Sequence, residues 1–307
     1  MKPSAINCAA DKANVVFVGA DNDISSPAGQ GADKGPAAVR SCLEGQIEFR
    51  EHRTGIVAVE RLKIGWLDLG DLNGNRDATS LGEAVSKVCA ACQLAHDSGQ
   101  FPFVIGGDHS NAIGAVMAVG QKYDPRQVTV VHIDAHHDLR YDDGDCADPP
   151  LGRLAHGCAL RHAAEVGFSL VQIGIRSYSR EEAEYARQNR RVTAFYWGGE
   201  ADFRPPTARN ILKAVKTELV YLTVDVDGID PSFMPATGRP VSGGLGWWYA
   251  WDLLQAICQE KRLVGADICE VSPRPPDRLT ERNAAQLAYN IVTWALLAKK
   301  KTVAGSP

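Results

Sequence analysis

The chain has 307 residues, of which 45% are hydrophobic and 23% are charged, and its formal net charge at pH 7 is −4. This composition is typical of a globular protein with a sizeable core, and the mild acidity argues against nucleic acid as the main partner. No apolar run approaches the ~20 residues that cross a membrane, and the first residues contain no apolar signal core. We therefore expect a cytoplasmic protein without a membrane partner. Eight scattered cysteines predict reduced thiols rather than a disulfide framework.

Short apolar segments recur along the chain, and helix-like segments lie between them. Several apolar segments are hydrophobic at nearly every position, as expected for strands that are covered on both faces. We predict eight strands, at residues 14–20, 63–69, 101–107, 127–134, 169–175, 191–197, 219–227 and 262–268.

The segments between these strands have helical character. We predict helices at residues 35–45, 81–98, 109–122, 180–189, 207–217, 248–260 and 281–299. The alternation predicts an α/β protein with one mostly parallel, eight-stranded sheet between helical layers. Residues 1–307 are expected to form a single domain with short flexible ends, because the sequence shows no internal repeat and no low-complexity linker.

Four polar segments follow predicted strands. They are GGDHS at 106–110, DAHHD at 134–138, DVDGIDPS at 225–232 and DICEVSP at 267–273. Functional sites of parallel α/β sheets usually lie at the carboxyl ends of the strands, so these segments are expected to meet. Several buried carboxylates at one place would repel each other, which predicts a positive charge among them.

A binuclear metal site satisfies that requirement. In an extended segment alternate residues share a face, so Asp134, His136 and Asp138 should point together, as should Asp225 and Asp227. With His109 they make six candidate ligands, whose four carboxylates would balance two divalent ions. Carboxylate and imidazole ligands without thiolate suit Mn²⁺, and also Co²⁺, Ni²⁺ or Zn²⁺.

Simpler roles are open for individual residues. A single Asp at the end of a strand is often a helix cap or a turn former. His132 lies earlier in its strand and is better interpreted as a core residue or as support for a ligand. His137 has the opposite parity to the proposed ligands, so support or packing is also its better interpretation.

The motifs GGDHS, DAHHD and DVDGIDPS resemble the three signatures of the ureohydrolase family, which includes arginase and agmatinase. The similarity extends through GADKGPAAVR, VQIGIRS and DICEVSP and covers residues from about 14 to 297. It implies an arginase-like, three-layer α/β/α fold and two divalent metal ions per chain. Mn²⁺ is the metal that the resemblance implies, and Ni²⁺ is the alternative.

The resemblance also implies roles for individual residues. One metal would be bound by His109, Asp134, Asp138 and Asp225, and the other by Asp134, His136, Asp225 and Asp227, so that Asp134 and Asp225 bridge. The shared water would supply hydroxide to attack a guanidinium carbon, giving urea and an amine.

Two further residues are expected to take part in catalysis. His156, in RLAHGCALR, would give the leaving nitrogen its proton. Glu270, in DICEVSP, would pair with the substrate guanidinium. Together with Asp134, these are the predicted catalytic residues.

The substrate is less well determined by the sequence. The segment CADPPLGRLAH lacks the Ser-Gly-Asn loop of arginase-like chains, and Ser177 follows Arg176 where arginases tend to place an acidic residue. Both departures favour agmatine, the best guess here, or another guanidino compound that lacks an α-amino acid head group. However, Arg239 in MPATGRPV, and Arg153 near His156, would repel the ammonium of agmatine and attract a carboxylate. Exposure to solvent or a subunit interface is the alternative for both arginines.

Several alternatives to an agmatinase therefore stay open. They are a guanidinobutyrase or guanidinopropionase, a hydrolase of small guanidines or biguanides, a formiminoglutamase, a metal-binding partner subunit of another ureohydrolase chain, and an amide hydrolase of the deacetylase kind. The family resemblance also implies a homo-oligomer, trimeric or hexameric, with a hetero-oligomer as the alternative.

Overall fold

The computed structural model describes residues 4–26, 31–72, 80–144, 151–200 and 202–303. In this part of the chain eight strands form one sheet in the order β2-β1-β3-β8-β7-β4-β5-β6, and every neighbouring pair is parallel. The strands are β1 (Val15–Ala20), β2 (Ile64–Asp68), β3 (Phe101–Gly106), β4 (Val128–Ile133), β5 (Ser169–Ile175), β6 (Val192–Tyr196), β7 (Leu219–Asp225) and β8 (Arg262–Cys269). The predicted eight-stranded sheet is confirmed, and it is entirely parallel.

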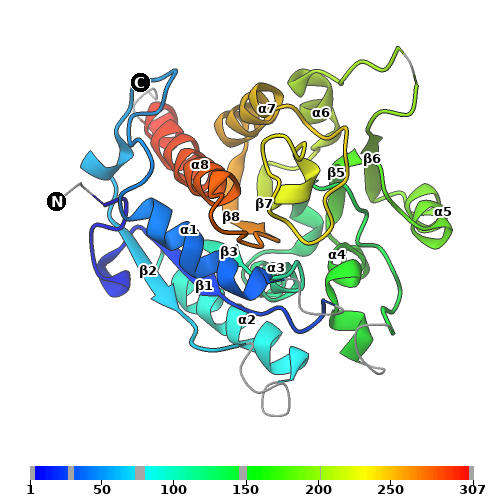
Figure 1. The fold of residues 1–307 in the computed structure, drawn as a ribbon, viewed down its shortest axis with the longest axis horizontal. Helices are drawn as coiled ribbons and strands as arrows, with labels where there is room; N and C mark the ends of the chain where they lie inside the picture. Colours follow the sequence, from blue (N-terminus) through cyan, green and yellow to red (C-terminus); the bar gives the residue numbers. More distant parts are fainter. Residues whose placement is uncertain (1–3, 27–30, 73–79, 145–150, 201, 304–307) are drawn as a thin grey trace.

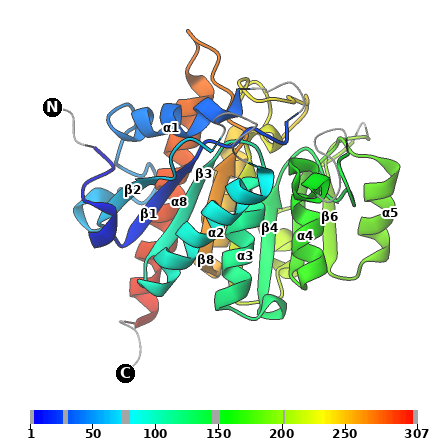
Figure 2. The same ribbon diagram turned by 90° about the horizontal axis from the view of Figure 1, so that it is seen from below.

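Helices cover both faces of this sheet (Figures 1 and 2). One face shares a hydrophobic core with α1 (Gly35–Leu43), α6 (Ala208–Ala214), α7 (Trp247–Glu260) and α8 (Leu279–Val303). The other face packs on α2 (Leu81–Asp97), α3 (Asn111–Lys122), α4 (Ala159–Val166) and α5 (Arg180–Gln188). The three-layer α/β/α arrangement expected from the resemblance is therefore present.

Strand β1 shows why the apolar segments lack polar positions. Val15 and Phe17 belong to the core on one face, whereas Val16 and Val18 belong to the core on the other. Both sets are buried, because a parallel strand in the middle of a sheet has helices on each side.

Helix α4 is the one α-helix of the described residues that the sequence analysis did not predict. It has only eight residues and follows a short 3-10 turn at His156–Cys158. Its buried positions Ala159, Leu160, Ala163 and Ala164 repeat at helical spacing, and Gly167 ends it in a left-handed conformation with φ of 118°. These two signals were available in the sequence.

The sheet order brings the polar segments together. Strands β3, β8, β7 and β4 are consecutive neighbours, so the residues that follow them meet at one edge of the sheet. Among the described residues, no helix combines the length and the apolar character needed to cross a membrane. The expectation of flexible ends concerns in part residues 1–3 and 304–307, which lie outside the described residues.

Candidate active site

A buried cluster of imidazole and carboxylate groups lies at the carboxyl ends of β3, β4 and β7. The Nδ1 atom of His109 is 2.8 Å from Asp138 Oδ2 and 3.3 Å from Asp134 Oδ2. Asp225 Oδ2 is 3.9 Å from the same nitrogen. These groups come from three strands that are far apart in the sequence, as the motif analysis expects.

A second group shares Asp134 with the first. His136 Nδ1 lies 3.1 Å from Asp227 Oδ2 and 3.4 Å from Asp134 Oδ1. The ligand atoms of His109, Asp134 and Asp138, and those of Asp134, His136 and Asp227, form two sets, within each of which all atoms lie within 4.8 Å of one another. The donor chemistry of both sets fits a divalent metal ion. Their common member, Asp134, is one of the two residues expected to bridge, whereas Asp225, the other, belongs to neither set.

The backbone brings these side chains together in a different way from the predicted one. Strand β4 ends at Ile133, and Asp138 has a φ of 52°, in the left-handed region. Strand β7 ends at Asp225, and a 3-10 turn at Val226–Gly228 then places Asp227. The assumption that both segments stay extended is therefore wrong, although the residues do gather.

The neighbours of His109 determine which of its ring nitrogens can bind a metal. The Thr223 hydroxyl donates to Asp267 Oδ1 at 2.7 Å, so at 2.8 Å from His109 Nε2 it acts as an acceptor. The proton of neutral His109 therefore lies on Nε2, and the lone pair of Nδ1 faces the carboxylates. No described residue satisfies Nδ1 with a well-directed hydrogen bond, which fits a metal ligand.

His132 has the opposite arrangement. The Gln172 amide donates to His132 Nδ1 at 3.0 Å and to the His137 carbonyl at 2.7 Å, while its oxygen accepts from His137 Nδ1 at 2.8 Å. Nε2 of His132 therefore carries the proton and donates to Asp134 Oδ2 at 2.7 Å. His132 therefore holds the candidate bridging carboxylate directly, and His137 holds Gln172, which orients His132. Both are supporting roles, which the sequence favours for these residues.

The protonation behaviour of the cluster shows its excess of negative charge. Burial, together with the charges of Asp227 and Asp134, raises the pKa of Asp225 well above its ordinary value. Burial alone would lower the pKa of His136, but Asp227 and Asp134 outweigh it and raise that pKa to about 12. The site therefore attracts positive charge, which divalent ions can supply in place of protons.

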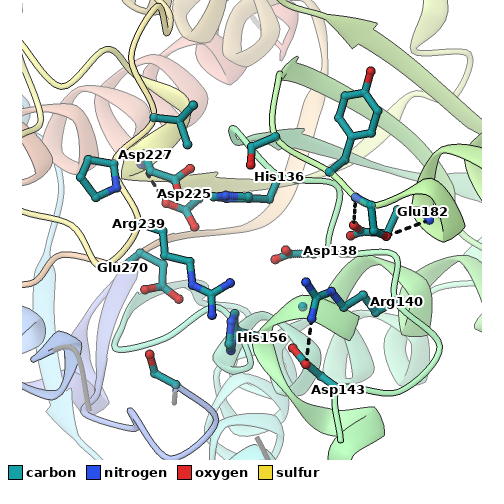
Figure 3. Close-up of a pocket in the computed structure, with 17 residues that line it drawn as sticks. His136, Asp138, Arg140, Asp143, His156, Glu182, Asp225, Asp227, Arg239 and Glu270 are labelled. Atoms are coloured by element: carbon teal, nitrogen blue, oxygen red, sulfur yellow. Dashed lines mark hydrogen bonds and ion pairs between the residues drawn. The ribbon is translucent and has the colours of Figure 1, made fainter. Parts of the chain in front are cut away.

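A cavity of about 440 Å³ opens beside the cluster. It is lined by the candidate ligands His136, Asp138, Asp225 and Asp227 and also by His156, Glu270 and Arg239. Figure 3 shows Arg239 pointing into this space, on the side where Glu270 and His156 lie. Most of the predicted site residues are thus brought together.

Glu270 occupies a strained and buried position in this cavity. It is one of two non-glycine residues with positive φ in the described part of the chain, at 63°, and the other is Asp138. Its Oε1 accepts the backbone N–H of His109 at 2.9 Å. Burial and the nearby Asp108 raise the pKa of Glu270 well above its ordinary value.

Two other charged groups of the cavity wall have structural partners. Arg140 pairs with Asp143 at 3.0 Å. Glu182 accepts backbone N–H groups of Ser179 and Leu139. Arg140 and Glu182 therefore stabilise the wall of the cavity, and both can still contact a ligand.

Arg153 lies apart from the other candidate residues. Its guanidinium pairs with Glu165 at 2.6 Å and stacks over Tyr141 with 4.5 Å to the ring centroid. It is not among the residues that line the cavity. The structure therefore does not bring Arg153 to the place where the sequence analysis expected it.

The sequence analysis missed several residues that orient the site. Thr223, Asp267 and Gln172 lie inside strands, where a polar residue among apolar ones was the available signal. The strand register then places Gln172 beside His132 and Thr223 beside both His132 and Asp267. We call these four residues the polar row, because they follow one another across β5, β4, β7 and β8.

The sequence of this chain is similar to those of proteins with known names. Residues 13–293 match the model of the Arginase family. The chain is 31% identical to the N(1)-aminopropylagmatine ureohydrolase of Synechocystis sp., over 98% of this chain and 95% of that protein. It is also 31% identical to the guanidinobutyrase of Pseudomonas aeruginosa, over 92% of this chain and 85% of that protein.

Two solved structures are similar to this chain over nearly its whole length. The proclavaminate amidino hydrolase from Streptomyces clavuligerus superposes with a TM-score of 0.80 at 26% identity, over 97% of this chain and 96% of that one. The agmatine ureohydrolase of Thermoplasma volcanium superposes with a TM-score of 0.77 at 25% identity, over 100% of this chain and 96% of that one.

Proposed function

The chain belongs to the arginase family, and from this premise we propose that it hydrolyses a guanidino acid to urea and an amino acid. The family relationship makes it a ureohydrolase that acts on the C–N bonds of guanidino compounds. The observation that carries the narrower proposal is the position of Arg239 in a cavity that also contains Glu270.

The first part of the proposal concerns the metal site. His109, Asp134, Asp138 and Asp225 would hold one divalent ion, and Asp134, His136, Asp225 and Asp227 the other. The outward Nδ1 lone pair of His109 and the surplus of carboxylates support this assignment. Two such ions supply a water of lowered pKa, so that hydroxide is available near neutral pH. Mn²⁺ is the proposed metal because carboxylates are the majority of the candidate ligands, and Ni²⁺, which imidazole ligands suit, is the alternative.

Glu270 is proposed to bind the substrate guanidinium. One of its oxygens accepts the His109 backbone N–H, which leaves the other to face the cavity. A guanidinium donates two parallel hydrogen bonds, and its positive charge compensates the negative charge of a buried carboxylate. Binding would therefore keep Glu270 ionised and place the guanidinium carbon beside the cluster.

His156 is proposed to give a proton to the leaving nitrogen. It lines the same cavity as Glu270, and the short turn at His156–Cys158 fixes its backbone. An imidazole can donate a proton near neutral pH, and the amine cannot leave without one.

Arg239 is proposed to bind the far end of the substrate. It is exposed, and no described carboxylate lies within ion-pair distance of it, whereas Arg140 pairs with Asp143. A carboxylate tail would be attracted to Arg239, while the ammonium of agmatine would be repelled. This reverses the order that the sequence alone favours, and 4-guanidinobutyrate and 3-guanidinopropionate become the leading substrates.

A second candidate is agmatine or an alkylated agmatine. Its support is the similarity, over nearly the whole chain, to a protein named as an N(1)-aminopropylagmatine ureohydrolase. Asp143, which lines the cavity, could bind an ammonium if Arg140 turned away from it.

The test is urea release by the chain loaded with Mn²⁺ or with Ni²⁺. The substrates are 4-guanidinobutyrate, 3-guanidinopropionate, agmatine, arginine, guanidine and a biguanide. We expect a guanidino acid to give the highest kcat/KM. The substitution Arg239→Glu should lower kcat/KM for the guanidino acid at least ~10-fold and raise kcat/KM for agmatine. Arg153→Glu is the matched control, because it makes the same reversal of charge outside the cavity. Preference of the unmodified chain for agmatine would contradict the role of Arg239.

A further inference from the structure

A buried serine and a buried aspartate lie next to His156. Ser25 and Asp108 are both 0% exposed. Ser25 Oγ lies 2.7 Å from Asp108 Oδ2 and 3.2 Å from His156 Nδ1. The backbone N–H of His156 also donates to Ser25 Oγ, at 3.0 Å. Ser25 thus contacts both the ring and the backbone of the proposed proton donor.

The count of hydrogens determines the direction of each hydrogen bond. Asp108 accepts from the backbone N–H and the hydroxyl of Ser25 at one oxygen, and from the same two groups of Ser110 at the other. Four donors fill the acceptor capacity of an ionised carboxylate. The single hydroxyl proton of Ser25 is therefore committed to Asp108, and its oxygen can only accept from His156.

This direction defines the tautomer of the imidazole. If Nδ1 of His156 had no proton, its lone pair would face the lone pairs of the Ser25 oxygen at 3.2 Å. A proton on Nδ1 turns that repulsion into a hydrogen bond. In the neutral ring, Nε2 then has the free lone pair.

We propose that Ser25 and Asp108 are positioning residues that keep the Nδ1 proton of His156 in place, so that Nε2 is the atom that exchanges protons with the substrate. This inference rests on the proposed function, in which His156 protonates the leaving nitrogen. Ser25 and Asp108 touch no substrate; they act through the imidazole.

The proton balance shows what the arrangement achieves. Water adds its oxygen to the guanidinium carbon, the C–N bond to the substrate chain breaks, and both water protons end on the departing amine. His156 receives one of them at Nε2 and delivers it from the same atom, so the ring returns to its starting form. The Nδ1–H bond is not broken in the cycle, and with the other tautomer no lone pair would be available at Nε2.

A merely structural role for Ser25 is the competing explanation, since it also anchors the loop after β1 through Asp108. A double-mutant cycle separates the two. We expect Ser25→Ala in the Mn²⁺-loaded chain to lower kcat at least ~10-fold with little change in KM, and to have no further effect in a His156→Ala background. An equal loss in both backgrounds would overturn the proposal.

Three controls keep this test interpretable. Ser25→Thr retains the hydroxyl and is expected to recover most of the turnover lost in Ser25→Ala. Ser272→Ala makes the same change at another buried serine, whose hydroxyl has no partner among the described residues, and should leave kcat unchanged. Metal content and thermal unfolding of each variant show whether the fold and the metal site are intact.

A spectroscopic measurement tests the tautomer independently of turnover. In the chain loaded with diamagnetic Zn²⁺, ¹⁵N NMR of the histidine rings, assigned by comparison with His156→Ala, should show the proton of neutral His156 on Nδ1. A proton on Nε2 would overturn the proposal. If no guanidino compound yields urea while Nδ1 is protonated, the proposed function fails and the positioning by Ser25 stands.

Discussion

Two histidines of the site show how a neighbouring side chain decides the role of the same residue type. Thr223 accepts from His109, which leaves a lone pair facing the metal cluster, whereas Gln172 donates to His132, which leaves an N–H facing Asp134. The first arrangement suits a ligand, and the second suits a support for a ligand. The motif GGDHS could identify His109, but only the residue across the sheet determines its tautomer.

Thr223→Val tests this dependence. The substitution keeps the shape of the side chain but removes the acceptor for His109 Nε2, so the imidazole is no longer held as an Nδ1 ligand. We expect metal affinity to fall ~10- to 100-fold, measured by calorimetric titration with Mn²⁺. Thr129→Val is the matched control, because Thr129 is equally buried but bonds to Thr217, at the opposite end of β4. Unchanged affinity in Thr223→Val would show that Thr223 does not orient the ligand.

Asp23 provides a prediction about pH. Burial, followed by the charge of Asp108, raises its pKa to about 6 from an ordinary value of 3.8. The folded chain therefore retains a proton that the unfolded chain loses, and stability falls as pH rises between these two values. Asp23→Asn removes this penalty while keeping an acceptor for the N–H groups of Gly31 and Ala32.

We expect Asp23→Asn to be more stable than the parent chain by about 1–3 kcal/mol at pH 7.5, and to have nearly equal stability at pH 4. Thermal unfolding of both proteins at both pH values measures this difference. The groups of the metal site titrate equally in the two proteins, so their contribution to stability disappears from the difference. A gain at pH 4 as large as that at pH 7.5 would exclude the ionisation of Asp23 as the cause.

At the scale of the elements, the loops continue the alignment of the strands. Beyond the last paired residues of β1 and β3, the N–H of Gly107 donates to the Ala20 carbonyl and that of Asp108 donates to the Asn22 carbonyl, both at 2.7 Å. The Glu270 N–H donates to the Gly107 carbonyl at 2.8 Å. The segments after β1, β3 and β8 therefore form one hydrogen-bonded layer beneath the cavity.

Gly107→Ala should disrupt this layer. A Cβ atom at Gly107 would lie 2.0 Å from the Asn22 carbonyl oxygen, which is backbone and cannot rotate away. We expect a loss of stability of about 2 kcal/mol or more, together with lower kcat, because Asn22 leads to Ser25 and Gly107 supports Glu270. Denaturant unfolding and urea release measure the two effects. Wild-type stability would mean that the loop after β1 can move aside at little cost.

The sequence predicted the strands well and the loops poorly, for physical reasons. Apolar runs bounded by polar residues locate each of the eight strands to within two residues at either end. The left-handed Asp138 and the turn at Val226–Gly228 carry no comparable local signal, so the argument from alternation was wrong there. The polar row and the contact of Ser25 with His156 depend on register and on loop packing, which a single sequence does not encode locally.

At the scale of the whole molecule, metal ions should contribute to stability as well as to chemistry. The candidate ligands come from the ends of β3, β4 and β7, so one ion would link segments that are up to 116 positions apart, between His109 and Asp225. Such an ion binds the folded chain much better than the unfolded one, and it replaces protons on groups such as His136.

Metal removal is therefore expected to lower the melting temperature. Mn²⁺ at about 1,000 times its Kd would stabilise the fold by about 4 kcal/mol, which corresponds to a shift of roughly 6 °C for a chain of 307 residues. Calorimetry with and without chelator measures it, and the shift should shrink as pH falls because protons compete for the ligands. In an Asp134→Ala chain, Mn²⁺ should have little effect. A shift of parental size there would mean that the stabilising ion binds elsewhere.

The positive φ angles of Asp138 and Glu270 have a consequence for the adaptation of this protein to heat. Each of these residues combines an unfavourable backbone conformation with a carboxylate that the interior tolerates badly, so glycine at either position should make the metal-free chain more robust. A laboratory selection for heat resistance alone, without a demand for turnover, should therefore enrich substitutions at these two positions. Its most durable survivors would be intact folds that no longer release urea.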